Sequence, residues 1–85
     1  MTALQEKLVQ MALEVNARAT IDGPDDMDRP FSEIGLDSLD TMSLMLAVTE
    51  QFAIRIPDSE IDAIQTLNEL ADVIQRKMAE PEQGS

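Results

Sequence analysis

Aliphatic side chains recur at steps of three and four residues in three separate stretches of this sequence, residues 3 to 18, 38 to 52 and 67 to 79. Side chains spaced in this way lie on the same side of an α-helix, so each stretch predicts an amphipathic helix. Thr2 precedes the first stretch and is a candidate N-terminal cap. The apolar stripe of that first stretch consists of Leu4, Leu8, Met11, Ala12 and Val15.

A shorter helix is predicted between the second and third stretches. The segment PDSEIDAI, residues 57 to 64, begins with a proline and offers Asp58 as a helix cap. Thr66 and Glu69 then have the spacing of a capping box, which predicts the start of the last helix. The apolar stripe of the last helix consists of Leu67, Leu70, Ala71, Ile74 and Met78.

We therefore expect an all-α fold, a small four-helix bundle with three longer helices and one short helix. Phe31 and Phe52 are the only aromatic residues among 85, whereas the strands of a β-sandwich favour aromatic and β-branched residues. A chain of this length forms one small core. We expect one domain over residues 1–79, followed by a disordered tail, EPEQGS, over residues 80–85.

A long loop is predicted between the first and second helices. Its sequence, TIDGPDDMDRPFSEIGLD (residues 20 to 37), contains two glycines and two prolines, which interrupt regular structure. The aspartates of DGPDDMD do not have the alternating spacing of an EF-hand loop, so we expect no dedicated metal site. Four apolar residues of the loop are candidates to hold it against the bundle: Ile21, Phe31, Ile34 and Leu36.

The chain is strongly acidic. Seventeen acidic and six basic residues give a formal net charge of −11, and eleven of the acids lie between residues 20 and 62. Nucleic acids and anionic membranes attract basic surfaces, so neither is expected as a partner. The longest apolar run, residues 44 to 48, is too short to cross a bilayer, and MTALQEKLVQ does not have the pattern of a signal peptide. We expect a cytoplasmic monomer whose partners are proteins with basic surfaces.

Two residue types that carry much of enzyme chemistry, cysteine and histidine, do not occur in the sequence. Their absence excludes a thiol nucleophile and disulfide bonds, the usual general base of a serine hydrolase, and the ligands of most zinc sites. We therefore expect no catalytic residues and a protein that is not an enzyme.

The predicted helix over residues 38 to 52 has two apolar faces. Leu44, Met45, Val48 and Phe52 form the face expected to pack in the core. A second stripe lies almost opposite this face and consists of Leu39, Met42 and Leu46. The long loop or the short helix could cover this second stripe, or the stripe could be a docking surface for partner proteins. Both interpretations hold if the loop covers only part of the stripe.

Ser38 lies where this helix is predicted to begin, between Asp37 and Leu39. A role as a nucleophile is rejected, because the chain has no histidine to accept the proton. Ser38 or Asp37 could cap the helix, which would contribute about 1 kcal/mol. Alternatively, the Ser38 hydroxyl could carry a phosphate group, because a helix N-terminus accommodates negative charge. The residues alone leave the last two roles open.

The segment FSEIGLDSLDTMSLMLAVTEQF, with IRIPDSEI after it, resembles the acyl carrier protein family. The resemblance is strong over about residues 31 to 60 and extends to length, acidity, helix order and the long first loop. The Asp-Ser-Leu signature opens the second helix. The positions that carry the resemblance are Phe31, Ile34, Gly35, Asp37, Ser38, Leu39, Phe52, Ile56 and Pro57.

The resemblance implies that Ser38 carries 4′-phosphopantetheine, attached from coenzyme A by a phosphopantetheinyl transferase. The thiol of this group would hold an acyl or aminoacyl group as a thioester. The partners would then be the enzymes that load and transfer this cargo in fatty-acid, specialised lipid, polyketide or related biosynthesis. Leu39, Met42, Leu46 and Ile56 would make apolar contacts with them, and Asp37, Asp40 and Glu50 would pair with their basic residues.

Ser43 stands where carriers of general fatty-acid synthesis usually have glutamate. This loss of charge on the recognition helix favours a specialised member of the family over a housekeeping one. The alternative interpretation is a noncatalytic, acidic helical module that binds a partner protein and has no prosthetic group.

Overall fold

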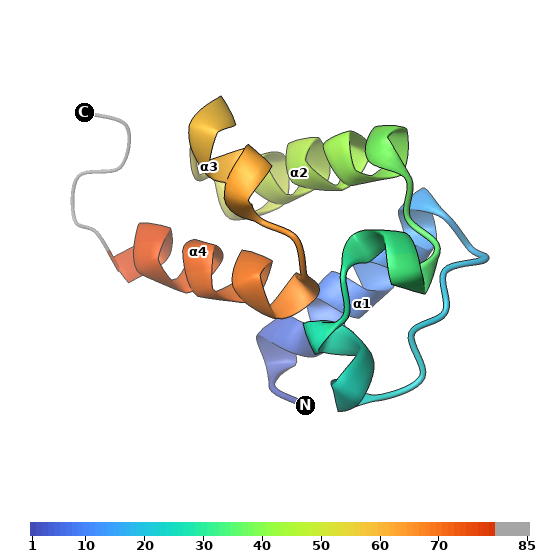
Figure 1. Cartoon of the computed structure of the whole chain (residues 1–85). Coiled ribbons are helices and arrows are strands. Elements are labelled where there is room, and N and C mark those ends of the chain that lie inside the picture. The colour runs from blue at the N-terminus through green and yellow to red at the C-terminus, as the bar shows by residue number, and fades with distance from the viewer. Residues whose placement is uncertain (80–85) are drawn as a thin grey trace.

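The computed structural model describes residues 1–79 and contains only helices and connecting segments in that range (Figure 1). The all-α four-helix bundle with a long loop between the first two helices is confirmed. The radius of gyration, 12.1 Å, is close to the roughly 12 Å expected for a compact chain of this length. The tail predicted over residues 80–85 lies outside the described residues. The α-helices are α1 (Ala3–Val15), α2 (Ser38–Phe52), α3 (Asp58–Ala63) and α4 (Leu67–Ala79), and two 3-10 helices, η1 (Pro24–Asp28) and η2 (Phe31–Ile34), lie between α1 and α2.

The core forms around α1, against which α2 and α4 both pack (Figure 1). Leu8 and Ala12 of α1 are fully buried, as are Leu44 of α2 and Leu70 of α4. No polar or charged residue among residues 1–79 is buried, so the burial of apolar side chains accounts for the core. None of the described helices has the length and hydropathy of a membrane span.

The first helix ends earlier than predicted, at Val15 rather than residue 18. Asn16 leaves helical geometry, and its side-chain oxygen accepts a hydrogen bond from the Arg18 backbone N–H at 2.9 Å. Asparagine competes for backbone groups in this way and therefore often ends a helix. At the other end, the cap predicted at Thr2 is confirmed, and Gln5 completes a capping box with it.

The long loop is ordered by its own apolar residues. Phe31, Ile34 and Leu36 are buried, as expected, and Ile21 is partly buried. Met27 was not expected in the core, yet its side chain is completely buried in η1, which packs against α4. The acidic loop therefore belongs to the bundle and positions the start of α2.

Two details of α3 and α4 differ from the sequence analysis. Asp58 is the first residue of α3 rather than its cap, and the preceding Pro57 makes no side-chain capping bond. Met78 is 57% exposed rather than part of the core stripe, and Val73 is buried instead. The capping box of Thr66 and Glu69 is confirmed by two reciprocal hydrogen bonds of 3.0 and 3.2 Å.

Candidate functional site

Ser38 is the exposed first residue of α2, and a neighbouring residue caps the helix. Asp37 Oδ1 accepts a hydrogen bond from the Asp40 backbone N–H at 2.8 Å, and Asp40 Oδ2 accepts one from the Asp37 N–H at 3.2 Å. Because Asp37 and Asp40 form this capping box, Ser38 is not the cap. Its hydroxyl makes no hydrogen bond within residues 1–79. The hydroxyl is therefore accessible and has no structural role.

The turn before α2 brings Ser38 to the surface. Gly35 ends η2 with φ = 91°, a left-handed conformation that glycine adopts without strain. The following residue, Leu36, is only 2% exposed, and its N–H donates to the Phe31 carbonyl at 2.9 Å. Leu36 anchors the chain in the core, and two residues later Ser38 lies outside it.

An open groove of about 620 Å³ lies beside Ser38, between η2, the start of α2 and α3. Phe31, Leu36 and Ile64 form its apolar floor, and Met42 and Ile61 line it from α2 and α3. The other lining residues are Pro30, Ser32, Asp37, Ser38, Thr41, Asp62 and Gln65. An exposed serine beside an open groove with an apolar floor and a polar rim fits the attachment of a flexible chain with apolar parts.

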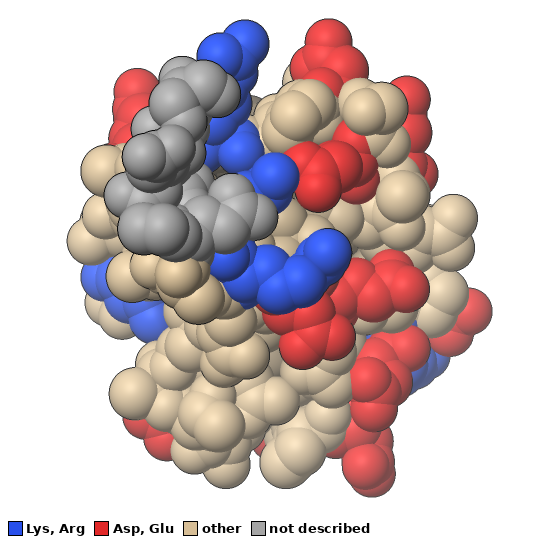
Figure 2. Space-filling view, turned by 90° about the vertical axis from the view of Figure 1, so that its left-hand side faces the viewer, with Lys and Arg blue, Asp and Glu red and all other residues tan. Residues whose placement is uncertain are grey.

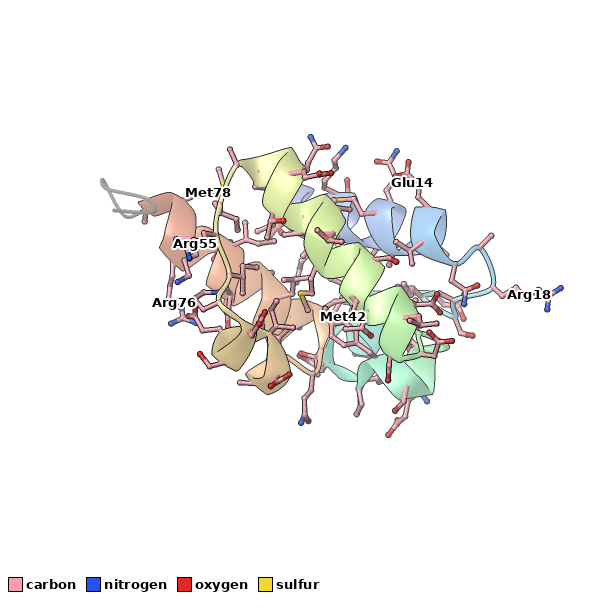
Figure 3. All side chains as sticks on the ribbon, turned by 90° about the horizontal axis from the view of Figure 1, so that it is seen from above. Glu14, Arg18, Met42, Arg55, Arg76 and Met78 are labelled. Carbon is pink, nitrogen blue, oxygen red and sulfur yellow. The ribbon has the colours of Figure 1, made fainter. Side chains whose placement is uncertain are left out.

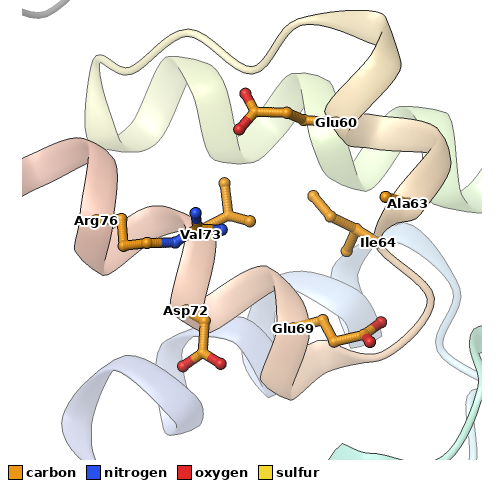
Figure 4. Close-up of a pocket in the computed structure, with 7 residues that line it drawn as sticks. All are labelled: Glu60, Ala63, Ile64, Glu69, Asp72, Val73 and Arg76. Atoms are coloured by element: carbon orange, nitrogen blue, oxygen red, sulfur yellow. The ribbon is translucent and has the colours of Figure 1, made fainter.

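A second hollow lies between α3 and α4 and is smaller, about 220 Å³ (Figure 4). Glu60, Glu69, Asp72 and Arg76 line it together with Ala63, Ile64 and Val73. None of its residues belongs to α2, and its charged lining is less suited to an apolar ligand. The groove beside Ser38 is therefore the candidate site.

The second apolar stripe of α2 is exposed. The side chains of Leu39, Met42 and Leu46 are 78%, 50% and 63% exposed, respectively. The loop and α3 leave these side chains open to solvent, so the interpretation that the loop or α3 covers the second stripe is wrong. Met42 lies on the side of α2 that faces α3, where the stripe meets the groove (Figure 3). We call these three residues the α2 stripe.

The other residues that were predicted to contact partner enzymes differ in how exposed their side chains are. Asp37 and Glu50 are exposed. Asp40 is half-buried, and its carboxylate is already engaged by the Asp37 N–H and by the side chain of Asn16. Ile56, which the resemblance also implied as a partner contact, is only 7% exposed and packs in the core cluster, so it offers little surface to a partner.

Charge is unevenly distributed between the two ends of the bundle. Basic side chains gather at the end where α4 finishes, and Arg55 and Arg76 lie there (Figures 2 and 3). Around Ser38 the nearby charged residues are acidic: Asp37 and Asp40 beside it in the chain, and Asp62 across the groove. A partner that approaches Ser38 therefore meets negative charge.

The sequence did not reveal the residues that build the groove. Ile61 and Ile64 belong to α3 and to the segment after it, more than twenty residues from Ser38, so no local spacing links them to it. Thr41 could have been found, because a residue three positions after Ser38 lies on the same helix face. Its hydroxyl donates to the Asp37 carbonyl at 2.9 Å.

Comparison with known proteins identifies the family. The family model described as "phosphopantetheine attachment site" matches residues 6–74. An acyl carrier protein of Sinorhizobium fredii is 34% identical over 74 residues, which covers 87% of this chain and 90% of that protein. The chain belongs to the acyl carrier protein family. Members of this family are carriers rather than catalysts, and their prosthetic group is 4′-phosphopantetheine. The noncatalytic module without a prosthetic group is therefore set aside.

Solved acyl carrier proteins have the same fold. A crystal structure of an acyl carrier protein from Thermotoga maritima matches with a TM-score of 0.78 and 28% identity, over 94% of this chain and 96% of that one. The hexanoyl form of the carrier from the actinorhodin polyketide synthase of Streptomyces coelicolor matches with a TM-score of 0.80 and 26% identity, over 96% and 95% of the two chains.

The match covers a smaller share of other curated acyl carrier proteins. A chloroplastic acyl carrier protein of Spinacia oleracea is 35% identical over 66 residues, which covers 78% of this chain but 46% of that protein. An acyl carrier protein of Guillardia theta is 42% identical over 48 residues, which is 56% of this chain and 59% of that protein. The chain thus spans about half the length of these relatives.

Proposed function

We propose that the Ser38 hydroxyl is the attachment point of 4′-phosphopantetheine. The observation that carries this proposal is the exposed Ser38 Oγ at the start of a helix that Asp37 already caps, beside an apolar groove. The first turn of α2 also favours negative charge near Ser38, because backbone N–H groups point out of a helix N-terminus.

The attachment step requires a partner enzyme. A phosphopantetheinyl transferase would join Ser38 Oγ to the phosphorus next to pantetheine in coenzyme A, and the phosphoanhydride bond would break to release adenosine 3′,5′-bisphosphate. The hydroxyl proton would pass to a base of the transferase, because no histidine or cysteine is present in this chain.

The attached group would supply the thiol that the sequence lacks, and an acyl or aminoacyl cargo would be held on it as a thioester. The residues of this chain would hold and present the group. Leu36, Met42 and Ile61 line the groove in which apolar parts of the arm or cargo would lie. Tethering would raise the effective concentration of the cargo at the active site of a docked enzyme.

The α2 stripe would contact these partner enzymes. Its three apolar side chains are exposed next to Ser38, and Asp37 and Glu50 are exposed on the same helix or at its cap. Exposed apolar residues supply contact area, whereas the acidic residues attract basic partner surfaces. Transferases, loading enzymes and acyl-transferring enzymes with basic docking surfaces would all meet this face.

We further propose that the cargo belongs to a specialised pathway rather than to general fatty-acid synthesis. Ser43 is exposed on α2 and is uncharged, which weakens attraction to basic partners. Housekeeping fatty-acid enzymes should use the modified wild-type chain poorly, and Ser43→Glu should restore part of the rate. Steady-state rates with a malonyl transferase and a condensing enzyme measure this. Efficient use of the wild-type chain would contradict the specialised assignment.

The attachment proposal is tested by intact mass after incubation with coenzyme A and a broad-specificity transferase. The wild-type chain should gain the mass of one phosphopantetheine, and Ser38→Ala should gain nothing. Ser59→Ala is the matched control, because Ser59 is an exposed serine in α3 that does not line the groove, and it should gain the full mass. Modification of Ser38→Ala, or no modification of the wild type by several transferases, would refute the proposal.

A further inference from the structure

We propose that Asn16, at the end of α1, is a positioning residue that presents Ser38 to the modifying enzyme. This inference rests on the proposed attachment at Ser38 and adds a residue that lies more than twenty positions away in the sequence. Asn16 is half-buried and forms the C-terminal cap of α1, where its backbone N–H donates to the Ala12 carbonyl at 2.9 Å.

The side-chain amide of Asn16 joins the two sides of the segment that carries Ser38. Its Nδ2 donates to the Gly35 carbonyl at 3.1 Å and to Asp40 Oδ2 at 3.0 Å. Gly35 lies three residues before Ser38, and Asp40 lies two residues after it. One amide group therefore links both sides of the attachment site to the end of α1.

The bond to Asp40 connects this link to the cap of α2. Asp40 Oδ2 accepts from Asn16 Nδ2 and also from the Asp37 N–H, so the same oxygen belongs to both interactions. A hydrogen bond to a carboxylate is stronger than one between neutral groups. No lysine or arginine within residues 1–79 forms an ion pair with Asp40, and Asn16 is the side chain outside the capping box that donates to it.

Without the Asn16 amide, the capping box would still form, but it would lose its connection to α1. The segment of Gly35 to Asp40 would then sample more orientations relative to the bundle. A transferase that recognises one orientation would bind the variant more weakly, because only a fraction of the molecules would be in that orientation. The expected effect is therefore on KM for the carrier rather than on kcat.

The test compares Asn16→Ala with Asn68→Ala in the full chain. Asn68 is a matched control: its Nδ2 donates to Asp28 Oδ1 at 2.6 Å and its Oδ1 accepts from Gln5 Nε2 at 2.9 Å. It joins α1, η1 and α4 and does not line the groove at Ser38. Both variants should lose some stability, so KM and kcat for phosphopantetheinylation are measured at a temperature at which both variants are folded.

In Asn16→Ala, KM for the apo chain in phosphopantetheinylation should rise about three- to tenfold with kcat nearly unchanged. Asn68→Ala should have the wild-type KM. Asn16→Asp loses the donor and places a carboxylate next to Asp40, so its KM should rise at least as much. In an Asp40→Ala background, Asn16→Ala should raise KM by a smaller factor than in the wild type, because one of the two acceptors of its Nδ2 is already gone and only the Gly35 carbonyl remains.

Amide hydrogen exchange provides a readout that does not depend on modification. The Asp37 and Asp40 amides should exchange faster in Asn16→Ala than in Asn68→Ala, relative to the wild type. A wild-type KM in Asn16→Ala, or equal effects of the two asparagine variants, would overturn the positioning role and leave the attachment proposal intact. Failure of the wild-type chain to be modified would refute the attachment proposal. In that case, wild-type exchange rates of the Asp37 and Asp40 amides in Asn16→Ala would separately refute the positioning role.

Discussion

Gly35 determines the direction in which the chain enters α2. Its φ of 91° lies in the left-handed region, and a Cβ at this position would lie 3.5 Å from the Ala19 Cα, an ordinary contact distance. Backbone conformation rather than space therefore explains the need for glycine here. This single residue lets Leu36 enter the core while Ser38 remains outside it.

Gly35→Ala should lower the free energy of unfolding by about 1–2 kcal/mol, because an alanine is strained at this φ. Gly23→Ala is the matched control: its φ is −167° and nothing lies within 4 Å of the added Cβ. The control should be neutral or stabilising by about 0.5 kcal/mol. Urea unfolding measures both values, and equal effects of the two substitutions would contradict the role of the Gly35 turn.

Asp26 makes the η1 turn sensitive to acid. Its carboxylate accepts a hydrogen bond from the Asp22 backbone N–H at 2.7 Å and contacts Arg29 at 3.3 Å. The Asp22 N–H, followed by Arg29, holds the pKa of Asp26 below its ordinary value of 3.8. A lowered pKa in the folded state stabilises the fold above the ordinary pKa, and this stabilisation is lost as the pH falls through the lowered value.

Asp26→Asn should therefore lose less stability than the wild type when the pH falls from 6 to about 2. The stabilisation that the ionised Asp26 carboxylate gives the wild type is already absent from this variant at pH 6. Thermal unfolding at several pH values measures the difference. Asp25→Asn serves as the control, since Asp25 is exposed and its side chain makes no hydrogen bond to residues 1–79. Parallel profiles for the wild type and Asp26→Asn would show that Asp26 does not contribute in this way.

At the level of the helices, α2 has one buried apolar face and one exposed apolar face, the α2 stripe. Leu44→Ala should lower the free energy of unfolding by about 2–5 kcal/mol, because Leu44 is completely buried. Leu46→Ala should change it by less than about 0.5 kcal/mol, because Leu46 is 63% exposed, yet it should raise KM for the modifying transferase. Urea unfolding and modification kinetics separate the two effects. A stability loss at Leu46 as large as that at Leu44 would place the α2 stripe in the core.

The features that could be predicted from the sequence are those that depend on residues close together in the chain. The bounds of α2, its two faces, the Thr2 cap of α1 and the capping box that begins α4 all follow from residues within one or two turns of each other. The second apolar stripe of α2 was also visible in the sequence, because Leu39, Met42 and Leu46 lie opposite the core face, but the sequence left open whether the stripe is exposed. The residue pattern placed Ser38 at the start of that helix, and the family resemblance implied that it carries the prosthetic group.

The features that were missed depend on contacts between distant segments. Met27 lies in an acidic stretch without helical spacing and becomes buried because η1 packs against α4. Ile56 was expected at the surface, but the segment between α2 and α3 places it in the core. Asn16 ends α1 earlier than predicted, and its side chain donates a hydrogen bond to Asp40, twenty-four residues away. Neither periodicity nor capping rules indicate such pairings.

At the scale of the whole molecule, the proposed attachment site, Ser38, is separate from the residues that form the core. The core is apolar, whereas acidic residues, the exposed α2 stripe and the groove lie around the Ser38 hydroxyl at the start of α2. A carrier needs this arrangement, because partner enzymes supply catalysis and the chain supplies a tether point and a recognition surface. The formal charge of −11 suits partners with basic surfaces.

The most direct test of this account is to locate the added group on the chain. After incubation with coenzyme A and a phosphopantetheinyl transferase, fragmentation of the intact protein in a mass spectrometer assigns the added mass to a residue. The account predicts that every fragment containing Ser38 carries one phosphopantetheine and that fragments with only Ser32, Ser43 or Ser59 carry none. Added mass on any other residue, or none at all, would contradict it.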